Sequence, residues 1–267
     1  MLSKLATFVA LAEAGKCPFG FDNDSNETAS TRPLVQSSVS YPSEIFTCSG
    51  TRAATTTTFS RDTYKAIVAD VIAKYEATND SVGANTNTRG KYAGCIVRTA
   101  GHDFMDFRKA SDGTTSGGSD GCINFADEDN TGLPECLTSS GLAAVYEKYC
   151  TTVSLADFLV IIGEAVMGRT AERYNPSNYY ETGSVAQAFL ENFKYGRTTA
   201  LTCPSNTGLM PNPENGCDGL KNIFVDHIYA GTGREWEFTA AISGAHTLGS
   251  ASIANSGYNG FWSSADQ

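Results

Sequence analysis

Residues 154–166 read SLADFLVIIGEAV, and they predict a strongly apolar helix. The apolar residues recur at intervals of three and four, which places them on one face of a helix. Ser154 stands where an N-cap residue is expected, and Asp157 occupies the capping-box position three residues later. The side chains expected to face inward are Leu155, Phe158, Leu159, Ile162 and Val166.

Further helical patterns follow along the chain, without an internal repeat or a clear alternating strand pattern. Residues 62–75 carry an apolar stripe at helical spacing. Gly-, Ser-, Asn- and Pro-rich stretches separate the helical segments. The predicted fold class is therefore mainly α with long loops. The other helices are expected at 91–109, 141–149, 220–229 and 238–248. Residues 15–60 are expected to form an irregular arm, and residues 76–90, 111–129 and 196–220 polar loops.

The composition limits the classes of function. A chain of 267 residues suits one large domain or two intimate lobes, and its 41% hydrophobic residues allow a buried core. The net charge of −10 argues against nucleic-acid binding, because such a surface repels phosphates. No apolar run reaches about 18 residues, so no membrane-spanning helix is expected.

The N-terminus resembles a secretory signal. Residues 1–14 join a basic start to a short apolar stretch and an A-x-A end, with cleavage expected after Ala14. The alternative is a short N-terminal helix. Export would take the protein outside the cell or into an organelle lumen, and sequons at Asn23, Asn26 and Asn79 suit a glycoprotein.

The eight cysteines support export. No two lie closer than 14 residues, which excludes C-x-x-C zinc or redox spacing, and an even count suggests disulfides. Cys203 with Cys217 is the first expected pair, and Cys17 with Cys48 is the second.

Only three histidines are present, which narrows the search for chemistry. Arg98 and His102 are four residues apart and would share a helix face, combining a proton shuttle with a fixed cation. The alternative is a surface pair near a helix end. His246 lies at an apolar, small-residue helix end that a flat cofactor could approach, unless it is a satisfied core histidine. His227 has no partner pattern and is assigned a structural or surface role.

Six motifs, taken in order, resemble the plant, fungal and bacterial haem peroxidase superfamily over about residues 60–265. Arg98-x-x-x-His102-Asp103 resembles the distal motif of that family, and SGAHTLG at 243–249 resembles the proximal one. The intervening motifs are GGSDGCI at 117–123, NTGL at 130–133, SLADFL at 154–159, and YGR at 195–197 followed by LMP at 209–211.

The resemblance implies a haem b held between two helical lobes, a distal lobe at about 61–170 and a proximal lobe at about 171–267. His246 would be the iron ligand. His102 would take a proton from hydrogen peroxide and deliver it to the leaving oxygen, while Arg98 stabilises the developing negative charge. Asn130 would accept the other ring N–H of His102.

The resemblance also implies structural sites. Asp157 and Arg197 would form a buried ion pair. Asp103, the Gly118 carbonyl and Asp120 would bind a distal calcium, although Cys122 replaces the usual serine ligand. Thr247 matches one position of a proximal cation site.

The C-terminal part mixes branches of the family. SGYNGFW at 256–262 resembles the branch of cytochrome c and ascorbate peroxidases, so Trp262 would be a proximal electron relay; the alternative is aromatic packing. Gly101 replaces the usual aromatic residue before the distal histidine, and Asn255 replaces the arginine of ascorbate enzymes. The sequence ends at Gln267, before the family's proximal aspartate and last helices, so the proximal lobe is expected to be incomplete here: either the sequence is a fragment, or the protein has lost part of the haem cradle.

Two functions follow. One is a secreted haem peroxidase that reduces hydrogen peroxide and oxidises small, phenolic-type donors. The other is a non-catalytic peroxidase-fold protein of an extracellular assembly.

Overall fold

The structure, a computed structural model, describes residues 38–78, 88–172, 175–203, 209–211, 216–251 and 260–261. This part is mainly helical, as predicted, and its strands are only two residues long. None of its helices is long and apolar enough to cross a membrane. The predicted signal segment, the three sequons, Asn255 and Trp262 lie outside the described residues.

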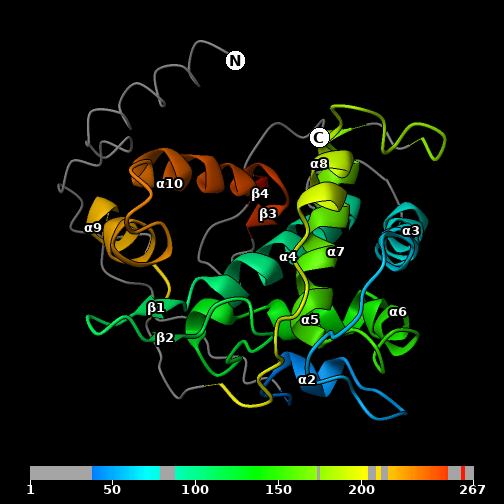
Figure 1. The fold of residues 1–267 in the computed structure, drawn as a ribbon, viewed down its shortest axis with the longest axis horizontal. Coiled ribbons are helices and arrows are strands. Elements are labelled where there is room, and N and C mark those ends of the chain that lie inside the picture. Colours follow the sequence, from blue (N-terminus) through cyan, green and yellow to red (C-terminus); the bar gives the residue numbers. More distant parts are fainter. Residues whose placement is uncertain are drawn as a thin grey trace.

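Helix α7 (Leu155–Ala171) is the central helix, as its apolar pattern predicted. Figure 1 shows it between α3 (Arg61–Ala77) and α4 (Thr88–Phe104), and both pack against it. The closest approach of α4 is at Gly163, where an added Cβ would lie 3.0 Å from the Cβ of Ala100. The lack of a side chain at this glycine therefore lets α4 lie close against α7.

The start of α7 is capped as predicted, but the capping box is not completed. The Ser154 hydroxyl accepts from the Asp157 N–H, and the Ser154 N–H donates to Thr56 Oγ1. The Asp157 carboxylate instead accepts from the N–H groups of Gly196 and Arg197. The expectation that Asp157 closes the box is wrong because the 196–197 segment takes its oxygens.

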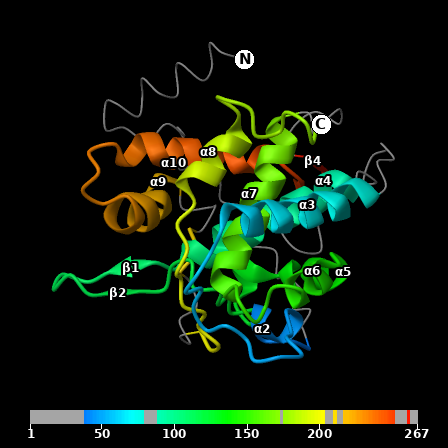
Figure 2. The ribbon, with the colours of Figure 1, turned by 45° about the vertical axis from the view of Figure 1, so that its right-hand side comes forward.

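Helix α4 ends earlier than the predicted Lys109. Its last residue is Phe104, and the Arg108 guanidinium donates to the carbonyls of Met105, Phe107 and Leu209, which holds the chain in a turn. A hairpin of β1 (Arg108–Lys109) and β2 (Thr115–Ser116) follows and projects from the body in Figure 2.

Two segments predicted to be irregular contribute to the core. Phe46 follows α2 (Pro42–Ile45) and is fully buried against Phe158 and Tyr146. Ile123 and Phe125 are also buried, so the expectation that 111–129 is too polar to pack is wrong in its second half. The remaining elements here are η1 (Glu128–Asn130), α5 (Leu133–Ser139), α6 (Leu142–Glu147) and α8 (Val185–Asn192); no helix was predicted for α5 or α8.

A second group of helices lies on the opposite side of α7 from α3 (Figure 1). It comprises α9 (Gly216–Leu220), the π-helix η3 (Lys221–Ile228), α10 (Glu235–Ser243), the 3-10 helix η4 (Gly244–Thr247), and the pair β3 (Ser250–Ala251) and β4 (Gly260–Phe261). The group meets α4 at two glycines, because a Cβ on Gly94 would lie 2.7 Å from the Cα of Gly249.

Three disulfides join described residues, Cys48–Cys150, Cys95–Cys136 and Cys122–Cys203, so both predicted pairings are wrong. Cys203 reaches Cys122 because Ala200 N–H donates to the Asp120 carbonyl, which lays the two segments side by side. Cys48 reaches Cys150 because Ala53 N–H donates to the Cys150 carbonyl.

Candidate functional site

Arg98 and His102 lie on one face of α4, as their spacing predicted. The Nε–H of Arg98 donates to His102 Nε2 at 3.3 Å. A guanidinium can only donate, so Nε2 is the unprotonated nitrogen of this imidazole. The other nitrogen, Nδ1, therefore carries the proton and donates to Asn130 Oδ1 at 2.7 Å. The arrangement selects one neutral tautomer with its lone pair on Nε2.

Asn130 is held so that its oxygen faces His102. Its Nδ2 donates to the Asn124 carbonyl at 2.8 Å, and its backbone N–H donates to the Asp127 carbonyl. Asn130 is buried, at the end of η1. The Asn124 contact fixes which end of the amide is oxygen, which supports the tautomer assigned to His102.

Arg98 joins α4 to the chain around η1. Its Nη1 donates to the Thr131 carbonyl at 2.9 Å, and its Nη2 donates to the Asp129 carbonyl at 2.6 Å. These carbonyls flank Asn130 in sequence. The cation and the partner of the histidine are therefore positioned by the same short segment.

Burial and charge keep His102 neutral. Burial lowers its pKa to about 3, with contributions from the positive charge of Arg98 and from His246, and only the Asn130 bond opposes them. A group with so low a pKa is unprotonated at neutral pH. His102 is therefore available as a base.

His246 lies in η4, which contacts α4, and its influence on the pKa of His102 places both histidines in one region. His246 Nδ1 lies 3.2 Å from the Ser243 carbonyl. A carbonyl only accepts, so Nδ1 is protonated and the lone pair is on Nε2, the arrangement of many metal-binding histidines. An added Cβ would find no atom within 4 Å at Gly244, and at Gly101 only Met105, at 4.0 Å. Gly244 and His246 are both exposed, so the space beside this histidine is open to solvent.

A small cavity opens beside His102. It measures about 20 Å³ and is lined by His102, Asn130, the Cys122–Cys203 disulfide and Met210, among others. A single water-sized molecule needs about 10–15 Å³. The cavity can therefore hold one small polar molecule against the imidazole. No sequence pattern predicted the disulfide wall, because the pairing depends on the tertiary path of the chain.

Asp103 follows His102 and is buried beneath the 117–123 loop. Its Oδ2 accepts from the Gly121 N–H at 3.2 Å, whereas its Oδ1 is buried without a hydrogen-bond partner. Burial, and then the negative charge of Asp120, raise the pKa of Asp103 well above its ordinary value. A buried carboxylate oxygen without a donor is the kind of group that a cation satisfies.

The other expected calcium ligands only partly surround Asp103. Asp120 Oδ1 accepts from the Cys122 N–H, and burial raises the pKa of Asp120 to about 6. Cys122 offers no thiolate, because its sulfur is in the disulfide. Thr247 belongs to η4, where its hydroxyl donates to the Gly244 carbonyl. Within the described ranges no three His, Cys, Asp or Glu side chains form a metal site by themselves.

Asp157 and Arg197 form the expected ion pair. Arg197 Nη1 lies 2.8 Å from Asp157 Oδ1; the Asp157 side chain is fully buried, and that of Arg197 is 30% exposed. The contact fixes the segment before residue 200 to the start of α7. Its role is structural, because neither side chain lines the cavity at His102.

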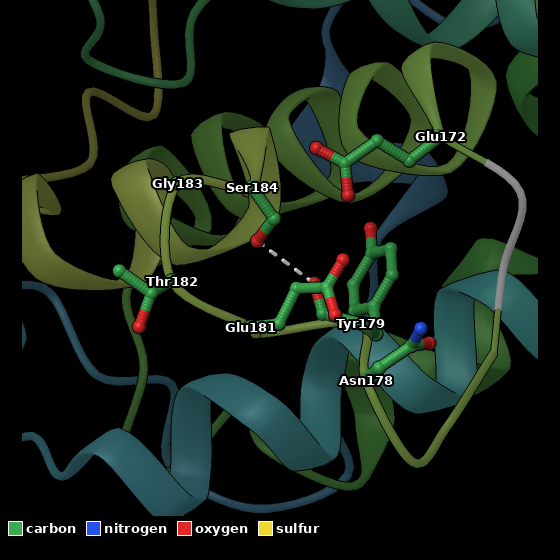
Figure 3. A pocket seen from close by; sticks show the side chains of 7 residues that line it. All are labelled: Glu172, Asn178, Tyr179, Glu181, Thr182, Gly183 and Ser184. Carbon is green, nitrogen blue, oxygen red and sulfur yellow. Dashed lines mark hydrogen bonds between the residues drawn. The ribbon is translucent and has the colours of Figure 1, made fainter.

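A larger pocket of about 390 Å³ lies elsewhere, between the end of α7 and the start of α8 (Figure 3). Two of its polar side chains already have partners: the Ser184 hydroxyl donates to the Tyr179 carbonyl and caps α8, and the Glu172 carboxylate accepts from the Val185 N–H. It contains no histidine or cysteine. The smaller cavity at His102 is therefore the better candidate site.

The third histidine has a structural contact, since His227 Nδ1 accepts from the Lys109 N–H at 3.3 Å. This bond ties η3 to the β1–β2 hairpin.

Compared with known proteins, the chain matches no protein-family model and no curated protein.

Proposed function

We propose that the protein is an exported haem peroxidase that reduces hydrogen peroxide and oxidises small, phenolic-type donors. The observation that carries the proposal is the Arg98–His102–Asn130 array, which leaves the lone pair of the buried His102 on Nε2, beside the Arg98 cation. The six ordered motifs support the family and its two-lobed fold. Three disulfides suit an oxidising compartment and hence export.

In this proposal His102 moves one proton. Nε2 accepts the proton of one peroxide oxygen and returns it to the other, which leaves as water. The proton on Nδ1 stays in place throughout, donated to Asn130 Oδ1, so the ring of His102 keeps its orientation. The positive charge of Arg98, already within hydrogen-bond distance of Nε2, stabilises the negative charge on the departing oxygen.

In this proposal a haem would lie between His102 and His246. His246 would hold the iron through Nε2, since its Nδ1 donates to the Ser243 carbonyl. Neither Gly101 nor Gly244 places a side chain beside its histidine. When bound, haem supplies the two electrons that break the O–O bond and takes them back from the donor. Trp262 is retained as the proposed relay to the donor.

A calcium ion is proposed at Asp103. The buried, unpartnered Oδ1 of Asp103 supports this site, together with the nearby carboxylate of Asp120. Oxygen ligands of this kind suit calcium. The Gly118 carbonyl is the third proposed ligand. Thr247 is retained as a proposed ligand of a separate proximal cation site.

One observation favours the alternative, a non-catalytic protein of the same fold. Arg98 donates to two backbone carbonyls as well as to His102, so the array is satisfied without a ligand. A purely structural array would have the same contacts. Haem binding distinguishes the two proposals, since the peroxidase requires a haem and the structural protein does not.

The test is to replace His102 with Ala in the haem-loaded protein and to follow peroxide consumption by stopped flow. Loss of a proton-transfer group is expected to slow the reaction by about 10²–10⁴-fold while haem stays bound. His227→Ala is the matched control, since His227 bonds the hairpin and does not line the cavity at His102, and it is expected to react like the wild type. Equal rates for both variants would overturn the assignment of His102.

A further inference from the structure

The face of α4 that carries Arg98 and His102 also carries Gly94. The three residues are spaced four apart, which places them on one side of the helix. Gly94 touches Gly249, which follows His246 by three residues. An added Cβ on Gly94 would lie 2.7 Å from the Cα of Gly249 and 3.2 Å from its nitrogen. Both atoms belong to the backbone, so no change of a side-chain rotamer relieves this contact.

Helix α4 is held firmly at Gly94. The neighbouring Ala93 and Ile96 are 1% and 0% exposed, so they are fixed in the core. Cys95, the next residue, is bonded to Cys136 of α5. Close-packed interiors give little room for a helix to shift. This turn of α4 is therefore the fixed side of the contact.

The segment 244–249 is the side that can move. Every residue in it is half-buried or exposed, and only Ala245 and Leu248 pack against the core. Gly249 has a φ of +87°, a conformation that side chains disfavour, and an added Cβ there would lie 3.0 Å from the Cα of Gly94. The contact thus requires glycine on both sides. A side chain at residue 94 would displace the segment rather than α4.

We propose that Gly94 is a positioning residue, whose contact with Gly249 sets how closely η4, and with it His246, lies against α4. Ordinary van der Waals contact begins at 3.4 Å, whereas a methyl group at residue 94 would have 2.7 Å. The segment must therefore move away by about 0.7 Å to admit it. The consequence for peroxide chemistry rests on the proposed function, whereas the positioning does not.

The experiment uses the full-length protein without haem, so its outcome is independent of peroxidase activity. Crystal structures of the wild type and Gly94→Ala are superposed on α4 and α7. Residues 244–249 are expected to be displaced from α4 by at least about 0.7 Å in the variant. Gly101→Ala is the matched control on the same helix. The nearest atom to its added Cβ is Met105 Cε, at 4.0 Å, so no displacement is expected.

A segment that keeps its wild-type position in Gly94→Ala, or a shift of α4 in its place, would overturn the proposal. Urea unfolding of the same variants separates this role from a structural one, because a contact that only stabilises the fold changes the unfolding free energy and not the position of His246. In the wild type, NMR is expected to show a strong nuclear Overhauser effect between the Hα protons of Gly94 and Gly249. Its absence would contradict the proposal without any variant having to fold.

Discussion

Glu164, on α7, is a half-buried carboxyl group whose ionisation costs stability. The Tyr64 hydroxyl donates to its Oε2 at 2.7 Å. Burial raises the pKa of Glu164 from 4.5 to about 7, although the Tyr64 bond and the charge of Arg197 act in the opposite direction. The folded protein therefore binds this proton more tightly than the unfolded chain does.

The sign of the pH effect follows from that difference. The stabilisation is fully present below pH 4.5 and is lost as the pH rises to about 7, because only the unfolded chain ionises the group freely across this window. One pKa unit corresponds to 1.36 kcal/mol, so the loss is about 3 kcal/mol. This is an upper value, since partial solvent access screens the charge.

Glu164→Gln removes the ionisation and retains an oxygen for Tyr64. We expect the variant to be more stable than the wild type above pH 7 by up to about 3 kcal/mol, with the difference disappearing towards pH 4.5. Urea unfolding at several pH values, followed by circular dichroism, measures this difference in the free energy of unfolding. Glu191→Gln removes an exposed carboxylate, hydrogen-bonded to Gln187, as a control. Parallel curves for wild type and Glu164→Gln would refute the reasoning.

Three further predictions concern the site and its supports. Asn130→Ala is expected to lower kcat/KM for peroxide by about 10–100-fold, because His102 loses the acceptor that fixes its ring. Arg197→Ala is expected to cost about 3–5 kcal/mol in urea unfolding, because the fully buried Asp157 is left without its cation. Calcium removal by a chelator is expected to lower the Tm, and Asp103→Asn is expected to abolish that response.

Each of these three predictions has a control variant in the same chain. Asn192→Ala removes an exposed amide that bonds only the Ala188 carbonyl and is expected to leave peroxide turnover unchanged. Lys148→Ala breaks an exposed pair with Asp70 and is expected to cost less than about 1 kcal/mol. Asp112→Asn, at the hairpin turn, is expected to keep the chelator response. Wild-type turnover in Asn130→Ala would contradict the first prediction. The second fails if Arg197→Ala is as stable as Lys148→Ala, and the third if the Tm of the wild type does not respond to the chelator.

Local patterns predicted the elements whose apolar faces decide their conformation. The stripes on α3 and α7 pack as expected, because a helix with one strongly apolar face has few other ways to bury it. The four-residue spacing placed Arg98 and His102 together for the same geometric reason. Asn130 could be assigned only from the family resemblance, since 28 residues separate it from His102.

Long-range contacts decided what the sequence could not predict. Helix α4 ends early because Arg108 reaches the Leu209 carbonyl about a hundred residues away. The disulfide of Cys203 follows from the pairing of Ala200 with Asp120. Ile123 is buried because the 117–123 loop packs over Asp103 near the end of α4 and against Ala156 at the start of α7. None of these contacts leaves a periodic trace in the sequence.

Haem binding tests the central claim most directly. The full-length protein is titrated with haem, its absorption spectrum is recorded, and one equivalent of hydrogen peroxide is added. We predict a stoichiometric Soret band that changes at once on adding peroxide, that is lost in His246→Ala, and that remains in His227→Ala. A folded wild-type protein that takes up no haem, or one whose band is the same in His246→Ala, would contradict the account.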